Sequence, residues 1–221
     1  MNRKAVLFLA AVMTAGSAVS AAAAETFADI NDVPWGGAQA YINSVYANGL
    51  MVGDINKDGE RVFRANDDIS YNETVQLVYA LSGKKTSAET INKWAEIMKY
   101  NNIPRWAYES TAYALETGII TRSNLSSFVN LDLTARSLTR EDAAYIFGRF
   151  LKNMGVEASA GVKTFADETR ISAVCAEYVD LLSSLDIMVG DENNNFNPNK
   201  TINRAEMAVI VTKTNNMLNS M

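Results

Sequence analysis

The feature that most constrains the fold of this chain is that its sequence repeats itself. "TFADIND" begins at Thr26 and "TFADETR" begins at Thr164. Each is followed by an apolar segment with helical spacing, and these segments end alike, as "LMVGD" and "IMVGD". A polar loop then leads to a Phe, and a Glu stands ten residues later, which gives the pairs Phe63 with Glu73 and Phe196 with Glu206. Such repetition indicates units that cannot bury their apolar faces alone.

A third copy lies between these two. "IPRWAYESTAYALETGIIT" contains the helix and the turn, and "LDLTARSLTRED" contains the later segment, with Asp142 in place of the Glu. We therefore expect three repeats that together form one domain: residues 25–83, 84–154 and 155–221.

Each copy predicts two helices, so the expected fold class is mainly α. The second helix begins at "SYNE", "TRED" or "NRAE". Ser70, Thr139 and Asn203 are good N-cap residues, and the acidic residue three positions later completes a capping-box pattern. In the second copy, "SAETINKWAEIMKY" predicts an additional amphipathic helix.

The N-terminus has the three-part layout of a secretory signal peptide. Arg3 and Lys4 precede an apolar run, and small residues follow up to an expected cleavage site near Ala24. A retained membrane anchor is the alternative, but the run is short of the about 20 apolar residues that cross a bilayer. We expect residues 1–24 to be removed, which leaves a secreted, soluble protein without a membrane span.

Composition excludes several functions. The formal net charge is −5, which gives no electrostatic footprint for nucleic acid. The chain has no His and one Cys, so a Ser-His or Cys-His nucleophile cannot form. The repeated acids could be imagined as a glycosidase pair, but the repeat explains their positions without catalysis. We expect no enzymatic activity and no cofactor.

"GDINKDGE", from Gly53, begins like a calcium-binding EF-hand loop. The closing acid that this loop needs at its twelfth position is replaced by Ala65. Asp58 and Gly59 are better explained as a turn, with Phe63 directed into the core. We expect no metal site, although weak calcium binding at this loop stays open.

The motifs "FAD" (twice), "WA" at Trp106, "GLMVG", "FNP", "LTRED" and "INRAE" resemble the S-layer homology (SLH) family. The resemblance implies three helix-loop-helix repeats in a pseudo-threefold arrangement around a central three-helix bundle. It also implies noncovalent attachment to the bacterial cell wall or cell surface. The implied partner is a secondary cell-wall polysaccharide with ketal-pyruvate groups, or peptidoglycan.

The resemblance also implies the ligand-binding residues. The Arg of the family motif corresponds to Arg140 and Arg204, whose guanidinium groups suit a carboxylate, while Trp106 suits a sugar ring. These Arg residues could instead form salt bridges between repeats, and Trp106 could simply pack. The full expected set is Arg140, Arg204, Trp106, Thr139, Asn203, Asp142, Glu206, Asp29, Asp167, Gly53, Gly190 and Tyr71.

Several departures from the family pattern affect this site. In the first repeat Tyr71 replaces the Arg, so the groove that uses this position is expected to be altered or inactive. The third repeat has Ser172 and Ala173 where the Trp would fall, and the second repeat lacks the "FAD" start. In the first repeat Trp35 is displaced relative to Trp106, because Gly36 and Gly37 follow it. At most two grooves therefore look competent. A protein-interaction or lattice-forming module that self-associates is the second hypothesis.

Overall fold

The computed structural model describes residues 27–158 and 164–221 and is mainly helical, as the sequence predicts. The predicted signal peptide lies outside the described residues. The α-helices are α1 (Ala38–Ala47), α2 (Tyr71–Ser82), α3 (Ala88–Tyr100), α4 (Tyr108–Glu116), α5 (Arg140–Asn153), α6 (Ala173–Ser184) and α7 (Arg204–Leu218). Three short 3-10 helices are η1 (Arg105–Ala107), η2 (Arg122–Ser127) and η3 (Glu168–Arg170). The antiparallel hairpin consists of β1 (Asp54–Ile55) and β2 (Arg61–Val62).

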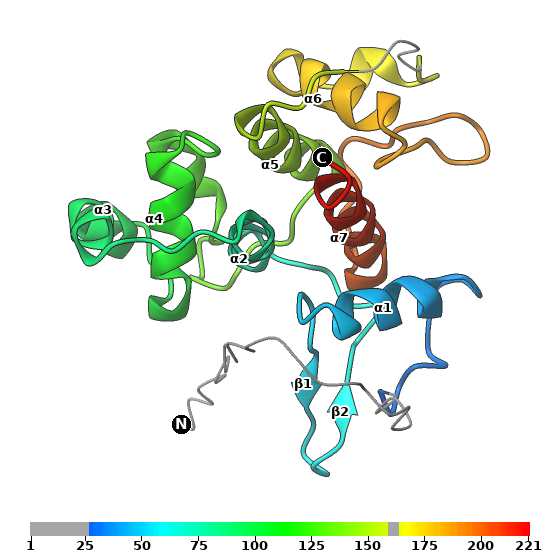
Figure 1. Ribbon diagram of the computed structural model, residues 1–221, viewed down its shortest axis with the longest axis horizontal. Helices are drawn as coiled ribbons and strands as arrows, with labels where there is room; N and C mark the ends of the chain where they lie inside the picture. The colour runs from blue at the N-terminus through cyan, green and yellow to red at the C-terminus, as the bar shows by residue number, and fades with distance from the viewer. Residues whose placement is uncertain (1–26, 159–163) are drawn as a thin grey trace.

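The helices pack in pairs that join neighbouring copies of the predicted repeat. Helix α4 packs on α2, α6 packs on α5, and α1 packs on α7 (Figure 1). The first helix of each copy thus lies against the second helix of another copy. The last pair brings together the first and last helices of the described chain, so the arrangement closes on itself.

The segments that lead into α2, α5 and α7 meet in a closed triangle of backbone hydrogen bonds. Ile69 N–H donates to the Ile202 carbonyl (3.0 Å), Ile202 N–H donates to the Leu138 carbonyl (3.0 Å), and Leu138 N–H donates to the Ile69 carbonyl (2.8 Å). The three side chains are fully buried. The starts of these three helices are therefore fixed relative to one another by the backbone itself.

The predicted N-caps are confirmed, with one difference. Ser70 and Asn203 form complete capping boxes at α2 and α7. At α5, Thr139 accepts a hydrogen bond from the Asp142 N–H, but no return bond to the Thr139 N–H is found in the described part of the chain. Asp is one methylene shorter than Glu, and its Oδ2 accepts hydrogen bonds from the Thr139 and Tyr71 hydroxyls.

The loop Phe residues lie in the core, as predicted for Phe63. The rings of Phe27 and Phe63 pack edge to face with centroids 5.2 Å apart. Gly53 is required beside them, because it has a φ of +69° and an added Cβ would lie 2.5 Å from the Phe27 ring. This packing positions the loop that follows α1.

The predicted amphipathic helix in the second copy is α3. Ser87 caps it, and it packs on α4 with Met98 buried. Among residues 27–158 and 164–221, no helix has both the length and the apolar character needed to span a bilayer.

Candidate functional site

Arg204 is the first residue of α7 and is held against the first copy of the repeat. Its Nε donates to the Phe63 carbonyl (2.8 Å), and its Nη1 donates to Glu73 Oε1 (3.0 Å). The guanidinium also lies over the Phe63 ring, 5.3 Å from the centroid. Burial lowers the pKa of Arg204, and the Glu73 carboxylate opposes that shift. Nη2 has no hydrogen-bond partner among the described residues.

Arg140, the first residue of α5, makes similar contacts with the third copy. Its Nε donates to the Phe196 carbonyl (2.7 Å), its Nη2 donates to the Val189 carbonyl (3.0 Å), and its guanidinium lies over the Phe196 ring. The equivalent acid, Glu206, pairs with Lys200 instead (2.6 Å). Arg140 thus has no ion-pair partner in the described part of the chain, and burial lowers its pKa.

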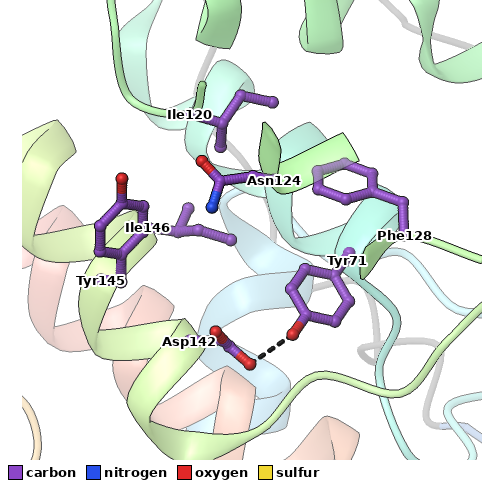
Figure 2. Close-up of a pocket in the computed structure, with 7 residues that line it drawn as sticks. All are labelled: Tyr71, Ile120, Asn124, Phe128, Asp142, Tyr145 and Ile146. Carbon is purple, nitrogen blue, oxygen red and sulfur yellow. Dashed lines mark hydrogen bonds between the residues drawn. The ribbon is translucent and has the colours of Figure 1, made fainter. Parts of the chain in front are cut away.

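Tyr71 occupies the same position at the start of α2. Its ring stacks on Phe128 with centroids 5.2 Å apart, and its hydroxyl donates to the Asp142 carboxylate (Figure 2). Burial, followed by the hydrogen bond to Asp142, raises the pKa of Tyr71. The space beside these side chains is about 10 Å³, which is about enough for one water molecule.

A much larger cavity, of about 390 Å³, lies beside Arg204. This volume is within the usual range for small-molecule sites. Arg204 comes from the third copy, and Trp106 and Ala135 come from the second. The first copy contributes the remaining lining residues: Gly49, Leu50, Met51, Val52, Gly53, Asp54, Arg64, Ile69, Ser70, Glu73, Gln76, Leu77 and Ala80.

The cavity combines an apolar wall with two ion pairs. Arg204 pairs with Glu73, and Arg64 pairs with Asp54. Trp106 lines the cavity and is 40% exposed. A ligand here would meet an indole, aliphatic side chains and a guanidinium nitrogen, which suits a sugar that carries an acidic group.

Comparison with known proteins identifies part of this architecture. A family model described as the S-layer homology domain matches residues 164–208, a segment that includes α6 and the start of α7 with Arg204. Residues 164–208 are therefore similar to an S-layer homology domain. The chain is also similar to the surface-layer 125 kDa protein of Lysinibacillus sphaericus, with 24% identity over 208 residues. That match covers 92% of this chain and 16% of the relative, so the chain spans about one-sixth of the relative's length.

Of the residues that the SLH resemblance nominates, Arg204, Trp106 and Gly53 come together at the large cavity. Tyr71 and Asp142 meet at the small one. Arg140 lies beside the loop of the third copy, separate from both.

The other nominated residues of the SLH set hold the backbone. Asp29 accepts hydrogen bonds from the Phe63 and Arg64 N–H groups (2.8 and 2.7 Å). Asp167 does the same for Phe196 and Asn197 (2.7 and 2.8 Å). Thr139, Asn203 and Glu206 cap helices, and an added Cβ on Gly190 would lie 3.2 Å from the Phe165 ring.

Sequence reasoning missed part of the cavity wall. Glu73, Gln76, Leu77 and Ala80 all lie on one face of α2 and all line the cavity. Their spacing of three, four and seven residues is the signal that could have identified this face. Arg64, which pairs with Asp54, carried no comparable signal.

The loop that resembles a calcium site is stabilised by its own hydrogen bonds. Asn56 Oδ1 accepts from the Asp58 and Glu60 N–H groups, both at 2.9 Å, and the Asp54 carboxylate is paired with Arg64. Across the residues that the structure describes, no group of three or more His, Cys, Asp or Glu side chains is arranged to hold a metal ion.

Proposed function

We propose that this chain is a non-enzymatic cell-surface module that attaches to the bacterial cell wall through three SLH repeats, at residues 25–83, 84–154 and 155–221. The SLH match and the similarity to a surface-layer protein support this proposal. In this proposal α2, α5 and α7 form a central bundle with pseudo-threefold symmetry. The closed triangle of hydrogen bonds at their starts supports that arrangement.

The proposed ligand is an acidic, pyruvylated secondary cell-wall polysaccharide. The observation that carries this assignment is that Arg204 and Trp106, from different copies of the repeat, line one cavity of sugar size. The free Nη2 of Arg204 would donate to the ligand carboxylate, and the indole would cover a sugar face. The aliphatic side chains of Leu77 and Ala80 would contact the ketal methyl group.

Glu73 has a positioning role in this site. Its Oε1 accepts from Arg204, while its Oε2 accepts from the N–H and hydroxyl of Ser70. The carboxylate therefore fixes the guanidinium relative to α2. Less side-chain conformational entropy is then lost when a ligand binds. It also repels an anionic ligand, so selectivity depends on a carboxylate placed against Nη2 and away from Glu73.

Binding to purified wall sacculi tests the proposal. The wild-type chain should bind native sacculi and lose binding after hydrofluoric acid removes the polysaccharide. Binding that survives this treatment would assign peptidoglycan as the ligand. No binding to either preparation would contradict wall attachment and favour a self-associating lattice module.

Variants of two residues test the site itself. Arg204→Ala should weaken binding by about 1.5–3 kcal/mol, which is about 10- to 150-fold. Trp106→Ala should also weaken it. Arg204→Lys keeps the charge but loses the planar fork, so it tests the guanidinium geometry with less damage to the fold. Arg170→Ala removes an exposed Arg distant in sequence from these residues and serves as the matched control. Equal binding by all four variants would contradict the assignment.

A further inference from the structure

Two of the departures from the family pattern, Tyr71 and Ser172, fall on the same groove, although they occur in different copies of the repeat. Tyr71 of the first copy donates its hydroxyl to Asp142, in the first turn of α5. Ser172 of the third copy donates its N–H (2.9 Å) and its hydroxyl (2.8 Å) to Glu141, in the same turn. The sequence alone suggests two separate defects, but the structure brings them together at the start of α5.

We propose that the groove at α5 is closed by a structural joint, which consists of the Tyr71–Asp142 and Ser172–Glu141 hydrogen bonds. The chain then binds two ligands, one beside Arg204 and one beside Arg140. This inference rests on the proposed function and adds the number and location of the working sites.

The groove at α5 has no room for a sugar. Tyr71 is 5% exposed, its ring is stacked on Phe128, and only about 10 Å³ remains beside it. Helix η2 contributes Asn124 to the wall of this space (Figure 2). A cyclic sugar needs many times this volume, and the acid that would hold a motif Arg is already bonded to the phenol.

The position at Arg140 differs from this groove in its charged groups. Arg140 is half-buried, and its guanidinium donates to two carbonyl groups that orient it. Glu206 forms its ion pair with Lys200, and no carboxylate among residues 27–158 and 164–221 forms an ion pair with Arg140. The Glu206, Asp191 and Asp167 carboxylates stabilise its charge without forming an ion pair with it, and a ligand carboxylate in direct contact would pair with the guanidinium.

Helix packing also suggests an aromatic platform for this second site. Trp35, 37% exposed, precedes α1, and α1 packs on α7. Trp106, in η1, precedes α4 by two positions rather than three, and α4 packs on α2. Each groove with a motif Arg therefore has a half-exposed indole before its covering helix, whereas the groove at α5 has Ser172.

Two sites on one domain strengthen its binding to a polymer. Once one site holds a repeating polysaccharide, the second binding event is intramolecular. Loss of either site should then weaken binding to the polymer by about 100-fold or more, while the affinity of the remaining site for a single sugar stays the same.

Isothermal titration with the methyl glycoside of a pyruvate-ketal hexose tests the inference. The wild-type chain and Tyr71→Phe should each bind two molecules. Arg204→Lys and Arg140→Lys should each bind one, and the double variant should bind none. The methyl ester of the same sugar should not bind, because it lacks the carboxylate. Circular dichroism and thermal melting of each variant verify that it is folded.

The outcomes separate the two levels of the proposal. A wild-type stoichiometry of one or three, or loss of a site in Tyr71→Phe, would overturn the two-site inference while leaving wall attachment intact. No binding of the sugar, together with no binding to sacculi, would overturn the proposed function itself. Sugar binding that neither Arg variant changes would place the sites elsewhere.

Discussion

Replacing Tyr71 by Phe removes one hydroxyl from the joint at the start of α5. The stacking on Phe128 is retained, so the change isolates the hydrogen bond to Asp142. A hydrogen bond to a charged group contributes about 1.5–3 kcal/mol. Because Thr139 still donates to the same carboxylate oxygen (2.5 Å), we expect the lower part of that range, about 1.5–2 kcal/mol. In a domain of this size that lowers the Tm by about 3–8 °C.

Urea denaturation at pH 7, followed by circular dichroism, measures this difference. Tyr113→Phe is the matched control, because Tyr113 is half-buried and its hydroxyl makes no hydrogen bond within the described residues. A double-mutant cycle with Asp142→Asn should give a coupling energy of about 1 kcal/mol or more. If Tyr71→Phe costs no more than Tyr113→Phe, or the coupling is under about 0.5 kcal/mol, the joint is not what stabilises this groove.

Three further changes test the packing, the loop and the pH dependence. Gly148→Ala should lower the free energy of unfolding by about 1–3 kcal/mol, because the new Cβ would lie 2.5 Å from the Tyr178 Cβ. Gly36→Ala, with nothing within 4 Å, is its control, and equal urea midpoints would contradict the close packing of α5 and α6. Asp167→Asn replaces one of two oxygens that accept backbone N–H groups, so it should cost about 1–3 kcal/mol in thermal melting; an unchanged Tm would refute this role. Because the pKa of Tyr71 is raised in the folded state, its stabilising contribution is present below about pH 10 and is lost as the pH rises further. Tyr71→Phe should therefore flatten the loss of stability between about pH 10 and 12, and an equally steep loss in both proteins would contradict the assignment.

Local features of this fold could be predicted from the sequence because they depend on neighbouring residues. Ser70, Thr139 and Asn203 cap their helices as expected, since the cap and its acid lie within one turn. The burial of Phe63 could also be predicted from its place in the repeat. Helical spacing identifies an apolar face, but it does not specify which helix covers that face. The pairing of α1 with α7 therefore could not be predicted.

The site was harder to predict than the fold, for a related reason. Glu73 was fully explained in sequence terms by the capping box at α2. A carboxylate has two oxygens, and only the structure shows that Oε1 is bonded to Arg204 while Oε2 is bonded to Ser70. Likewise, the sequence predicts that Tyr71 alters a groove, but it does not identify the partners of Tyr71. Asp142 and Phe128 lie in a different copy of the repeat and are brought to Tyr71 only by the fold.

The pairing of α1 with α7 has a consequence for how the protein is made. The Arg204 side chain reaches back to the Phe63 carbonyl across 141 positions of sequence. During synthesis, the apolar face of α1 cannot pack on α7 until α7 has emerged, and contacts of such wide separation slow folding. Trimming either end by one helix would not leave a smaller working unit; it would uncover the inner side of whatever remained and favour aggregation.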